Sequence, residues 1–400
     1  MTNQLRNSLI FLLLVLLASS AFVAGYFTND YIRQRHGGEP VAAANSSDQL
    51  GLFWEAWAFV ENSYLGELPN ETELSYGAIR GGLDLLNDPY TIFIEPVVRE
   101  QERINLRGTF GGIGATLTRP NEEGDIILEP IPGNPAAAAG IQAGDRLLAV
   151  DGQPITSAMT VQEVAEMIRG ETGTFVILTV IHLDETEAVD IEIERDDILV
   201  PSVTYRLTLE DPTIGYIQLS RFSGESSNEI AQAINELQAE GAEHLILDLR
   251  QNGGGLVDAA VSVADHFLTE GDILFQISRD EGERIYRSSN TTLAAAVPLI
   301  VLVNGGTASA SEILAGALHD RERAILVGQQ TFGKGSVQLV YDLSDGSSIH
   351  VTSSRWYTPA RNEIDQHGLT PDYEVEITQE DIDNGRDPIL LRAIELLQTE

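Results

Sequence analysis

A strand, a turn and the start of a helix follow one another in Leu299-Ile-Val-Leu-Val-Asn-Gly-Gly-Thr-Ala-Ser-Ala-Ser-Glu312. The aliphatic residues 299–303 predict a buried strand, and Asn304-Gly-Gly306 predicts a turn. A serine at position 309 would lie beside the unpaired N–H groups at the positive end of a helix dipole, where a developing oxyanion can be stabilised. Ser309 and Glu312 also spell a capping box, which would only satisfy the first helical amides. The motif alone leaves both interpretations open.

Position 334 carries the chain's only lysine, in Thr331-Phe-Gly-Lys-Gly-Ser-Val-Gln338, although the sequence has 24 basic residues. An ammonium can lose its proton when buried and act as a base, whereas a guanidinium stays charged. Chance within an arginine-rich composition is the alternative explanation. On an extended segment Lys334, Ser336 and Gln338 face one way, so the Gln338 amide could hold the amine through its carbonyl oxygen. The flanking glycines leave room for a close approach.

The chain has no cysteine, so the base for a hydroxyl nucleophile would be a histidine or a deprotonated lysine. His319 is ten positions from Ser309 on the same predicted helix. That is about 15 Å along the axis, which makes His319 a poor partner. A dyad of Ser309 and Lys334 is chemically coherent. It requires an amine that is neutral near pH 7, so Asp342 and Glu312 are expected to point away from it.

Strands alternate with helical segments from Pro201 onward, which predicts an α/β unit with a central sheet. We place this unit at residues 196–400. Its strand ends carry two glycine-rich segments, Gln251-Asn-Gly-Gly-Gly255 and Asn304-Gly-Gly306. The whole chain is therefore expected to be a multidomain α/β (α+β) protein.

Short strands and glycine turns fill residues 103–195. Two motifs there, Gly111-Gly-Ile-Gly114 and Ala143-Gly-Asp-Arg-Leu-Leu-Ala-Val-Asp-Gly152, resemble those of a PDZ domain. The resemblance implies a groove that accepts an extended peptide as an added strand, with loop amides facing the terminal carboxylate of that peptide. Those amides would belong to Gly112, Ile113 and Gly114. A tight turn without a ligand is the alternative for this loop.

The N-terminal residues 1–37 contain a membrane-targeting element. Leu9 to Phe27 are uncharged and mostly aliphatic, and these 19 residues would reach roughly 28 Å as a helix, enough for the hydrocarbon core. We expect a membrane anchor with the rest of the chain outside the cytoplasm. A signal peptide cleaved near Ala18-Ser-Ser-Ala21, which would give a secreted or periplasmic protein, is the alternative.

Residues 38–102 are expected to form a linker followed by a helical region. Leu50–Leu65 and Glu71–Leu86 place apolar residues at helical spacing, which predicts a pair of helices. The aromatic residues in the first helix are most simply a core or a subunit contact.

Five segments in the C-terminal half resemble the carboxy-terminal processing peptidases, also called tail-specific proteases. They are Asn304-Gly-Gly-Thr-Ala-Ser-Ala-Ser-Glu-Ile-Leu-Ala-Gly-Ala-Leu318, Thr331-Phe-Gly-Lys-Gly-Ser-Val-Gln338, Asp248-Leu-Arg-Gln-Asn-Gly-Gly-Gly255, Arg355-Trp-Tyr-Thr-Pro359 and His367-Gly-Leu-Thr-Pro-Asp372. By this resemblance, which covers the chain from about residue 50, Ser309 is the nucleophile, Lys334 is the general base and Gln338 orients the lysine. The resemblance also implies a peptidase core with a crotonase-like superfold and a homodimer formed through the N-terminal helices.

The same resemblance assigns the oxyanion hole to backbone amides. One donor would come from Gly254 or Gly255, between which the sequence does not choose, and the other from Ala310. Family members often carry proline or serine where this chain has Gly253, which would loosen the turn without removing a donor.

Other polar residues near these motifs receive supporting roles. Thr307 and Ser311 are expected to be helix-start residues, and Asp248 with Arg250 is expected to form a buried ion pair rather than to act in catalysis. Arg169, at the end of the predicted PDZ helix, would by the resemblance couple occupancy of the groove to the active site. A solvated surface arginine is the alternative for Arg169.

Composition excludes several classes of function. The formal charge is −37 and the pI is near 4.3, which argues against a nucleic-acid partner because such binding needs clustered basic residues. The absence of cysteine removes disulfides and thiolate nucleophiles. The seven histidines show no HExxH spacing, so we predict no metal site. No cofactor is needed for the chemistry of the dyad.

The sequence therefore predicts a serine endopeptidase that recognises the free, apolar C-terminal tail of protein or peptide substrates and cleaves them. Two other functions would use parts of the same sequence. A scaffold or chaperone would bind tails through the PDZ-like module without cleavage, and a crotonase-like enzyme would act on acyl thioesters. The serine, lysine and glutamine together argue against both.

Overall fold

The structure is a computed structural model that describes residues 50–120, 124–289 and 292–399. The predicted membrane segment, Leu9 to Phe27, lies outside these residues. None of the helices within the described ranges is both long enough and apolar enough to cross a bilayer. The chain divides into two compact units, Met1–Ser75 and Tyr76–Glu400.

The described part of the first unit is helical, as its apolar spacing predicts. α2 spans Gly51–Ser63, and α3 spans Glu71–Asp84 and continues into the second unit. α2 buries no residue, and its aromatic side chains contact one another: the Phe53 ring lies 5.0 Å from that of Trp54 and 6.3 Å from that of Trp57. Phe53 and Trp57 are about one helical turn apart, so their side chains lie on the same face of α2.

The second unit begins with elements that precede the PDZ-like region. A short strand, β1 (Ile92–Ile94), is followed by α4 (Pro96–Arg107), which starts with a proline at its first position and ends at Gly108 in the left-handed conformation. Proline fits the first turn of a helix, and glycine is the usual residue at such a C-terminus.

The PDZ-like region consists of short strands around two helices. One sheet has the order β3-β4-β5-β7-β8, with β6 paired to β5, and β2 pairs separately with β9. The elements are β2 (Thr109–Gly112), β3 (Ala115–Thr118), β4 (Ile126–Pro130), α5 (Pro135–Ala139), β5 (Asp145–Val150), β6 (Gln153–Pro154), α6 (Val161–Ile168), β7 (Phe175–Ile181), β8 (Val189–Glu194) and β9 (Asp196–Leu199). β3 therefore lies at an edge of its sheet, and α6 contacts it.

The C-terminal part contains the predicted central sheet. Its order is β10-β11-β12-β15-β16-β19, and every pair except β10–β11 is parallel. The strands are β10 (Val203–Leu207), β11 (Ile214–Leu219), β12 (His244–Asp248), β15 (Leu299–Val303), β16 (Ile325–Gly328) and β19 (Tyr373–Glu374). The helices of this part are α7 (Ser226–Ala239), α8 (Val257–Ala264), α9 (Ala310–Asp320), α10 (Gln379–Asp383) and α11 (Pro388–Leu397).

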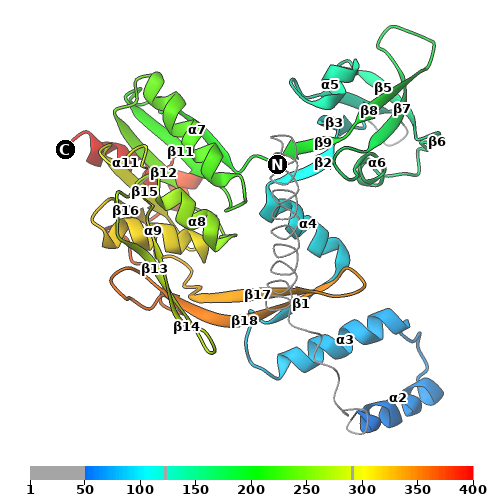
Figure 1. Ribbon diagram of the computed structural model, residues 1–400, viewed down its shortest axis with the longest axis horizontal. Helices are drawn as coiled ribbons and strands as arrows, with labels where there is room; N and C mark the ends of the chain where they lie inside the picture. The colour runs from blue at the N-terminus through cyan, green and yellow to red at the C-terminus, as the bar shows by residue number, and fades with distance from the viewer. Residues whose placement is uncertain (1–49, 121–123, 290–291, 400) are drawn as a thin grey trace, which may run out of the picture. The chain divides into compact units, whose positions relative to one another are not determined.

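Alternate residues of the central strands enter two separate cores. In β15, Leu299, Val301 and Val303 pack with α7, α8 and α9, whereas Ile300 and Leu302 pack with α11. Successive side chains of a strand point to opposite faces, so a sheet covered on both sides requires an uninterrupted aliphatic run. Figure 1 shows the helices on the two sides of this sheet.

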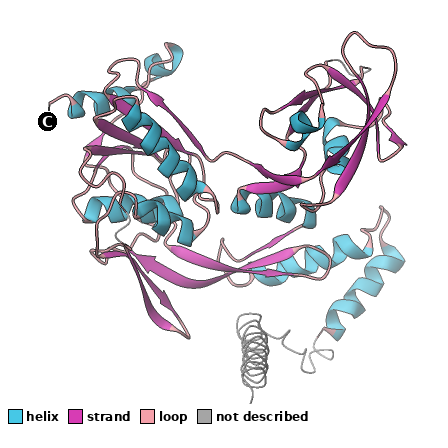
Figure 2. Ribbon diagram, turned by 45° about the horizontal axis from the view of Figure 1, so that its top comes forward, coloured by secondary structure: helices cyan, strands magenta, loops and turns pink. Residues whose placement is uncertain are grey.

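A second sheet carries the lysine segment. Its order is β1-β18-β13-β14, with β17 also paired to β18, and all its pairs are antiparallel. β13 is Asp272–Ser278, β14 is Gly282–Arg287, β17 is Ser336–Asp342 and β18 is Ser348–Tyr357. β17 and β18 form the long two-stranded ribbon visible in Figures 1 and 2. The observed architecture confirms a multidomain α/β protein; the domain boundaries drawn from the sequence stay predictions.

Candidate active site

Ser309 occupies the turn between β15 and α9 in an unusual backbone conformation. Its φ is 57° and its ψ is −117°, and its side chain is half-buried. L-residues rarely adopt this region, and such strain is typical of functional turns that expose a nucleophile. The turn also lies close to Gly254, where an added Cβ would be 2.9 Å from the Ser309 Cβ and 3.0 Å from the Ala310 nitrogen. Glycine at position 254 is therefore required by this close approach.

The structure separates Ser309 from the two other hydroxyl residues of the segment. Thr307 is fully buried, and its Oγ1 donates to the Leu249 carbonyl at 2.9 Å. Ser311 is also fully buried, and its Oγ donates to the Asn252 carbonyl at 2.8 Å. These two residues tie α9 to the neighbouring glycine turn, which is a more specific role than that of the helix-start residues we expected.

Glu312 joins the serine segment to the lysine segment. Its buried carboxylate accepts hydrogen bonds from the Ser309 N–H at 2.9 Å, the Thr331 hydroxyl at 2.6 Å, the Gly333 N–H at 2.7 Å and the Lys334 N–H at 2.9 Å. Charge-assisted bonds of this kind are stronger than neutral ones. Sequence reasoning treated Glu312 as a capping residue whose carboxylate points away from the amine, and it did not foresee this link. A carboxylate on an otherwise apolar, buried helix was the available signal.

The Lys334 side chain is half-buried and lies against an aromatic ring. Its Nζ is 4.9 Å from the centroid of the Tyr90 ring. Burial lowers the pKa of the Lys334 amine below its usual value, and the negative charges of Glu102 and Asp88 act in the opposite direction. The direction of the shift is the one that a lysine base requires.

The flanking glycines have a different role from the one expected. A Cβ at Gly335 would lie 2.5 Å from the Asp365 nitrogen, and one at Gly333, whose φ is +88°, would lie 2.9 Å from the Gly368 nitrogen. Both glycines therefore allow the 365–368 loop to pack against the backbone of the lysine segment.

Gln338 lies two residues into the ribbon after Ser336. Its Nε2 donates to the Ser336 Oγ at 2.9 Å and to the Thr352 Oγ1 at 3.4 Å. Within the described ranges, no hydrogen bond joins Gln338 to Lys334, and none joins Lys334 Nζ to Ser309 Oγ. The structure thus brings the segments of Ser309, Lys334 and Gln338 together, but the Lys334 amine contacts the Tyr90 ring rather than Ser309 or Gln338.

Asp342, the other carboxylate expected to avoid the amine, is bound by arginines of α4. Its oxygens lie 2.8 Å from Arg99 Nε and 3.1 Å from Arg103 Nη2. These ion pairs lower the pKa of Asp342 and leave the carboxylate without an ion pair to Lys334, in line with the expectation.

Within the described part of the chain, the N–H groups of the glycine turn, Gly253 to Gly255, do not all have hydrogen-bond acceptors. The Gly254 N–H donates to the Asn252 Oδ1 at 2.9 Å. Among the residues that the structure describes, no acceptor binds the N–H groups of Gly253, Gly255 and Ala310. Gly255 has a φ of +143°, and a Cβ there would be 2.1 Å from the Phe222 carbonyl oxygen. Asn252, which the sequence did not single out, fixes this turn.

A cavity of about 420 Å³ adjoins the glycine turn. α4 supplies one wall and the turn supplies the other. The apolar side chains in its lining belong to Val98, Leu106 and Phe222. The cavity therefore offers space for an apolar group next to the Ser309 turn.

Asp248 and Arg250 form the expected ion pair, with Arg250 Nη2 2.6 Å from an Asp248 oxygen that is almost fully buried. Arg250 also binds Asp387 at 2.8 Å, and the Tyr216 hydroxyl donates to Asp248 at 2.6 Å. This network holds β11, β12 and the start of α11 together, which is a structural role.

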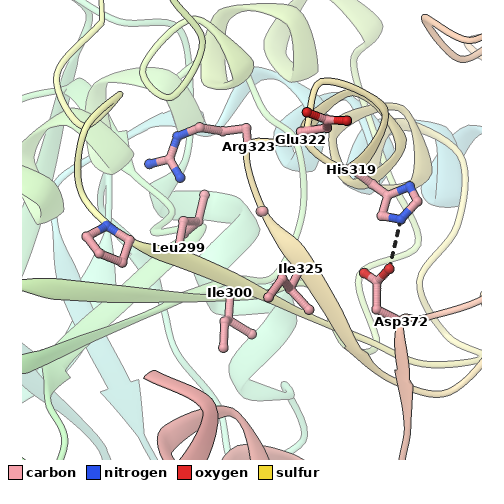
Figure 3. A pocket seen from close by; sticks show the side chains of 9 residues that line it. Leu299, Ile300, His319, Glu322, Arg323, Ile325 and Asp372 are labelled. Carbon is pink, nitrogen blue, oxygen red and sulfur yellow. Dashed lines mark hydrogen bonds and ion pairs between the residues drawn. The ribbon is translucent and has the colours of Figure 1, made fainter. Parts of the chain in front are cut away.

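His319 lies in a separate pocket. Figure 3 shows its ring beside Asp372, to which Nε2 lies at 3.1 Å, at the end of β15 where Leu299 begins the strand. Ser309 follows the other end of β15, so His319 is not a partner for it, as the sequence predicts. Within the described ranges, no group of three or more histidine, aspartate or glutamate side chains is arranged to hold a metal ion.

The predicted carboxylate-binding loop connects β2 to the edge strand β3. Gly114 has a φ of +68°, and a Cβ there would be 2.3 Å from the Asn134 Cβ. The carbonyls of Ile113 and Gly114 accept hydrogen bonds from residues near α5, whereas the neighbouring edge of β3 is unpaired in its sheet. Arg169 follows α6, and its guanidinium lies 5.0 Å from the centroid of the Phe110 ring on β2.

Two family profiles match the chain. The profile of peptidase family S41 matches residues 213–375, and a PDZ domain profile matches residues 126–181. These two ranges contain the predicted site residues of the C-terminal part and the strands of the PDZ-like sheet from β4 to β7.

Relatives with assigned names are similar over most of the chain. A carboxyl-terminal-processing protease of Picosynechococcus sp. is 36% identical over 346 residues, which are 82% of this chain and 83% of that protein. The carboxy-terminal processing protease CtpA of Bacillus subtilis is 32% identical over 379 residues, 94% of this chain and 78% of that protein. Among solved structures, a photosystem II D1 C-terminal processing protease is 34% identical with a TM-score of 0.45, covering 81% of this chain and 92% of that one.

Proposed function

The chain belongs to peptidase family S41 and is a serine-type, carboxyl-terminal-processing protease like the relatives that it matches; from this premise we propose that Ser309 is its nucleophile and Lys334 its general base. Gln338 is the residue that orients the lysine. The nucleophile, the base and the residue that orients the base are thus all side chains of this chain.

The observation that carries the dyad is the buried carboxylate of Glu312. It binds the backbone N–H of Ser309 and that of Lys334, both at 2.9 Å. Two segments that are separated in the sequence are thereby fixed to one anchor, and pre-organised geometry of this kind is what nucleophilic catalysis requires. The hydroxyls of Thr307 and Ser311 are already used by backbone carbonyls, which favours Ser309 as the nucleophile.

The reaction begins with a neutral lysine. Lys334 Nζ turns from Tyr90 toward Ser309 and takes the proton of the hydroxyl while Oγ attacks the scissile carbonyl carbon. The amine then returns the proton to the leaving nitrogen as the C–N bond breaks, leaving an acyl ester on Ser309. Water then attacks the ester. Lys334 takes a proton from this water and returns it to Ser309 Oγ as the acyl group leaves. Gln338 Oε1 would accept a hydrogen bond from the amine, since its Nε2 is bound to Ser336.

Backbone amides would stabilise the oxyanion. Ala310 and Gly255 are the favoured donors, because the Gly254 N–H is bound to the Asn252 side chain. The neighbouring cavity would receive a substrate side chain, and its lining by Val98, Leu106 and Phe222 favours an apolar one.

Substrate selection would begin at the PDZ-like module. An extended tail would pair with the open edge of β3, and its carboxylate would face the amides of Gly112, Ile113 and Gly114. This is supported by the edge position of β3 and its contact with α6. Arg169 would couple the occupied groove to the active site, and tails with an apolar C-terminus are the expected substrates.

The remaining assignments follow from the sequence. Residues 9–27 would anchor the protein in a membrane with the catalytic part outside the cytoplasm, or, if cleaved, release it as a secreted or periplasmic protein. The N-terminal helices would form a homodimer contact, and the peptidase core would share the crotonase-like superfold.

The proposal is tested by cleavage of a protein that ends in an apolar tail. Wild type is expected to cleave it, and Ser309→Ala is expected to leave it intact while still binding the tail. A substrate whose last two residues are replaced by aspartate serves as the control and should be cleaved more slowly. Tail binding without cleavage by wild type would instead support a scaffold.

A further inference from the structure

One aromatic residue upstream of the PDZ-like region reaches the catalytic lysine. Tyr90 belongs to the turn Asp88-Pro-Tyr-Thr91, just before β1, and its half-buried ring lies 4.9 Å from Lys334 Nζ. It is far outside the 213–375 range that matches the peptidase profile. The residues Asp-Pro-Tyr are typical of a turn, and nothing local indicates a contact with the lysine segment.

Side-chain hydrogen bonds fix the turn that carries Tyr90. The Asp88 carboxylate accepts from the Tyr90 N–H at 3.1 Å and from the Thr91 hydroxyl at 2.6 Å. Aspartate commonly closes turns in this way. The Thr91 Oγ1 also accepts from the Thr352 N–H at 3.1 Å. The Thr352 hydroxyl oxygen accepts from the Gln338 side-chain amide at 3.4 Å. The turn is thus bound to Thr352 of β18, which also accepts from Gln338, the residue proposed to orient the lysine.

Pairing in the sheet continues this attachment. β1 is antiparallel to β18, with Ile92 opposite His350 and Ile94 opposite Ser348. Tyr90 is therefore held at a fixed position beside the lysine segment by both the turn and the strand.

We propose that Tyr90 is a positioning residue for Lys334, and that its ring closes the space around the amine against water so that the amine stays uncharged until substrate arrives. This inference rests on the proposed function, since it assumes that a neutral lysine is the base. No role for Tyr90 follows from the motifs that define the family match.

The ring has two opposing effects on the amine. Its π electrons attract an ammonium, which favours the charged form of the amine. Its bulk removes water, which disfavours the charged form. Burial is the main cause of the lowered pKa of Lys334, and in this proposal the ring acts mainly through that burial.

Carboxylates face the amine or the ring from every neighbouring segment: Asp88 on the turn, Glu102 on α4, Glu312 on α9, and Asp365 on the loop after β18. Each has another partner. Asp88 and Glu312 bind the hydroxyls and N–H groups described above, Glu102 lies 2.8 Å from Arg99, and Asp365 accepts from the Gly335 N–H at 3.3 Å. The negative charges of Glu102 and Asp88 act to raise the pKa of Lys334, so its lowered value depends on burial.

The single lysine makes this inference measurable without turnover. Protein labelled with ¹⁵Nζ and ¹³Cε lysine gives one side-chain signal, because Lys334 is the only lysine. Titration of that signal by NMR, in full-length protein carrying Ser309→Ala, reports the pKa of the amine directly. Tyr90→Phe keeps the ring and should leave the pKa unchanged.

Tyr90→Ala opens the site and should raise the pKa of Lys334 by about one unit or more. In catalytically competent protein the same change should lower kcat about tenfold at pH 7, and raising the pH by one unit should restore the rate. Tyr373→Ala is the matched control. Tyr373 lies on β19 with the Arg392 guanidinium 5.1 Å from its ring centroid, and its loss should not move the Lys334 signal.

An unchanged or lowered pKa in Tyr90→Ala would overturn the inference. If that variant does not fold, Tyr90→Leu decides: leucine keeps water out without an aromatic ring, so the pKa should stay at or below the wild-type value, and a rise would contradict the role of water exclusion. The titration needs no turnover, so the two proposals fail separately. An active Lys334→Arg enzyme would refute the dyad. An unchanged Lys334 pKa in Tyr90→Ala would refute only the role of Tyr90.

Discussion

Ser309 is the residue at which backbone strain and proposed function coincide. Its φ of 57° is unfavourable for any side chain with a Cβ. We expect Ser309→Gly to be more stable than Ser309→Ala by about 1 kcal/mol, since only glycine adopts this conformation without strain. Both variants should be inactive. Urea unfolding of the pair measures the difference.

Ser311 supplies the matched control two residues further along, inside α9. There the order should reverse, with glycine less stable than alanine by about 1 kcal/mol, as in an ordinary helix interior. If glycine is less stable than alanine by the same amount at positions 309 and 311, backbone strain at Ser309 is contradicted.

Glu312 is the second residue with a testable role. Glu312→Gln keeps the shape but removes the negative charge and turns one of the two oxygens into an NH2 donor. One oxygen accepts from Thr331 and Gly333 and the other from Ser309 and Lys334, so at least one backbone N–H loses its acceptor. We expect kcat to fall at least tenfold and stability to fall by about 2 kcal/mol. Steady-state kinetics and urea unfolding measure these changes. Glu281→Gln, an exposed change, is the control; equal kinetics in both variants would contradict the anchoring role.

The sequence singled out the two residues that are proposed to react, but not the residues that support them. Ser309 and Lys334 could be found because a glycine turn and a solitary lysine are local signals. Glu312 and Tyr90 could not be assigned, because their contacts with the lysine segment cross many intervening residues, and a capping glutamate or a turn tyrosine looks the same in sequence whatever it later contacts.

α4, which lies outside the range that matches the peptidase profile, carries a carboxylate that affects the pKa of Lys334. Glu102 acts to raise the pKa of Lys334, so Glu102→Gln should lower it and shift the acid limb of the pH–rate profile downward by roughly half a unit. Stability should change little. Glu100→Gln on the same helix, where Glu100 is exposed and lies 3.5 Å from Arg103, is the control. An upward shift in Glu102→Gln would contradict the account.

The loop between β2 and β3 tests the tail-binding groove. Gly114→Ala is strained by a φ of +68° and also overlaps Asn134, whereas Gly140→Ala, at φ +99°, meets no atom within 4 Å. We expect Gly114→Ala to raise KM for a tailed protein at least tenfold while cleavage of a short unstructured peptide changes little. Gly140→Ala should affect stability only, by about 1 kcal/mol. Equal KM values for the two variants would argue against this groove.

At the level of elements, the strength of the local pattern decided what could be predicted. The aliphatic run of β15 and the apolar spacing of α2 and α3 gave correct elements. β13 and β14 were not predicted, because the antiparallel hairpin at 272–287 has a solvent-facing strand with little apolar alternation. The attachment of β1 to β18 depends on pairing across more than 250 residues, which no local pattern encodes.

Across the whole molecule, acidic residues greatly outnumber basic ones, and the single lysine lies in this acidic chain. The net charge of −37 favours a protonated lysine, so a neutral base requires burial and the pairing of nearby carboxylates with arginine, as at Asp342 and Glu102. Parts of the chain on both sides of the PDZ-like region contribute to this environment. The proposed catalytic site therefore combines Tyr90 and α4, which precede the PDZ-like region, with residues of the C-terminal part.

The most direct test of the Ser309–Lys334 dyad is the pH–rate profile of kcat/KM for wild type and Lys334→Arg on a protein with an apolar tail. Deprotonation of Lys334 should make wild-type activity rise with an apparent pKa clearly below the usual lysine value of about 10.4. The arginine variant, which cannot lose its proton, should be inactive at every pH. Activity in Lys334→Arg, or a wild-type profile without that rise, would contradict the account.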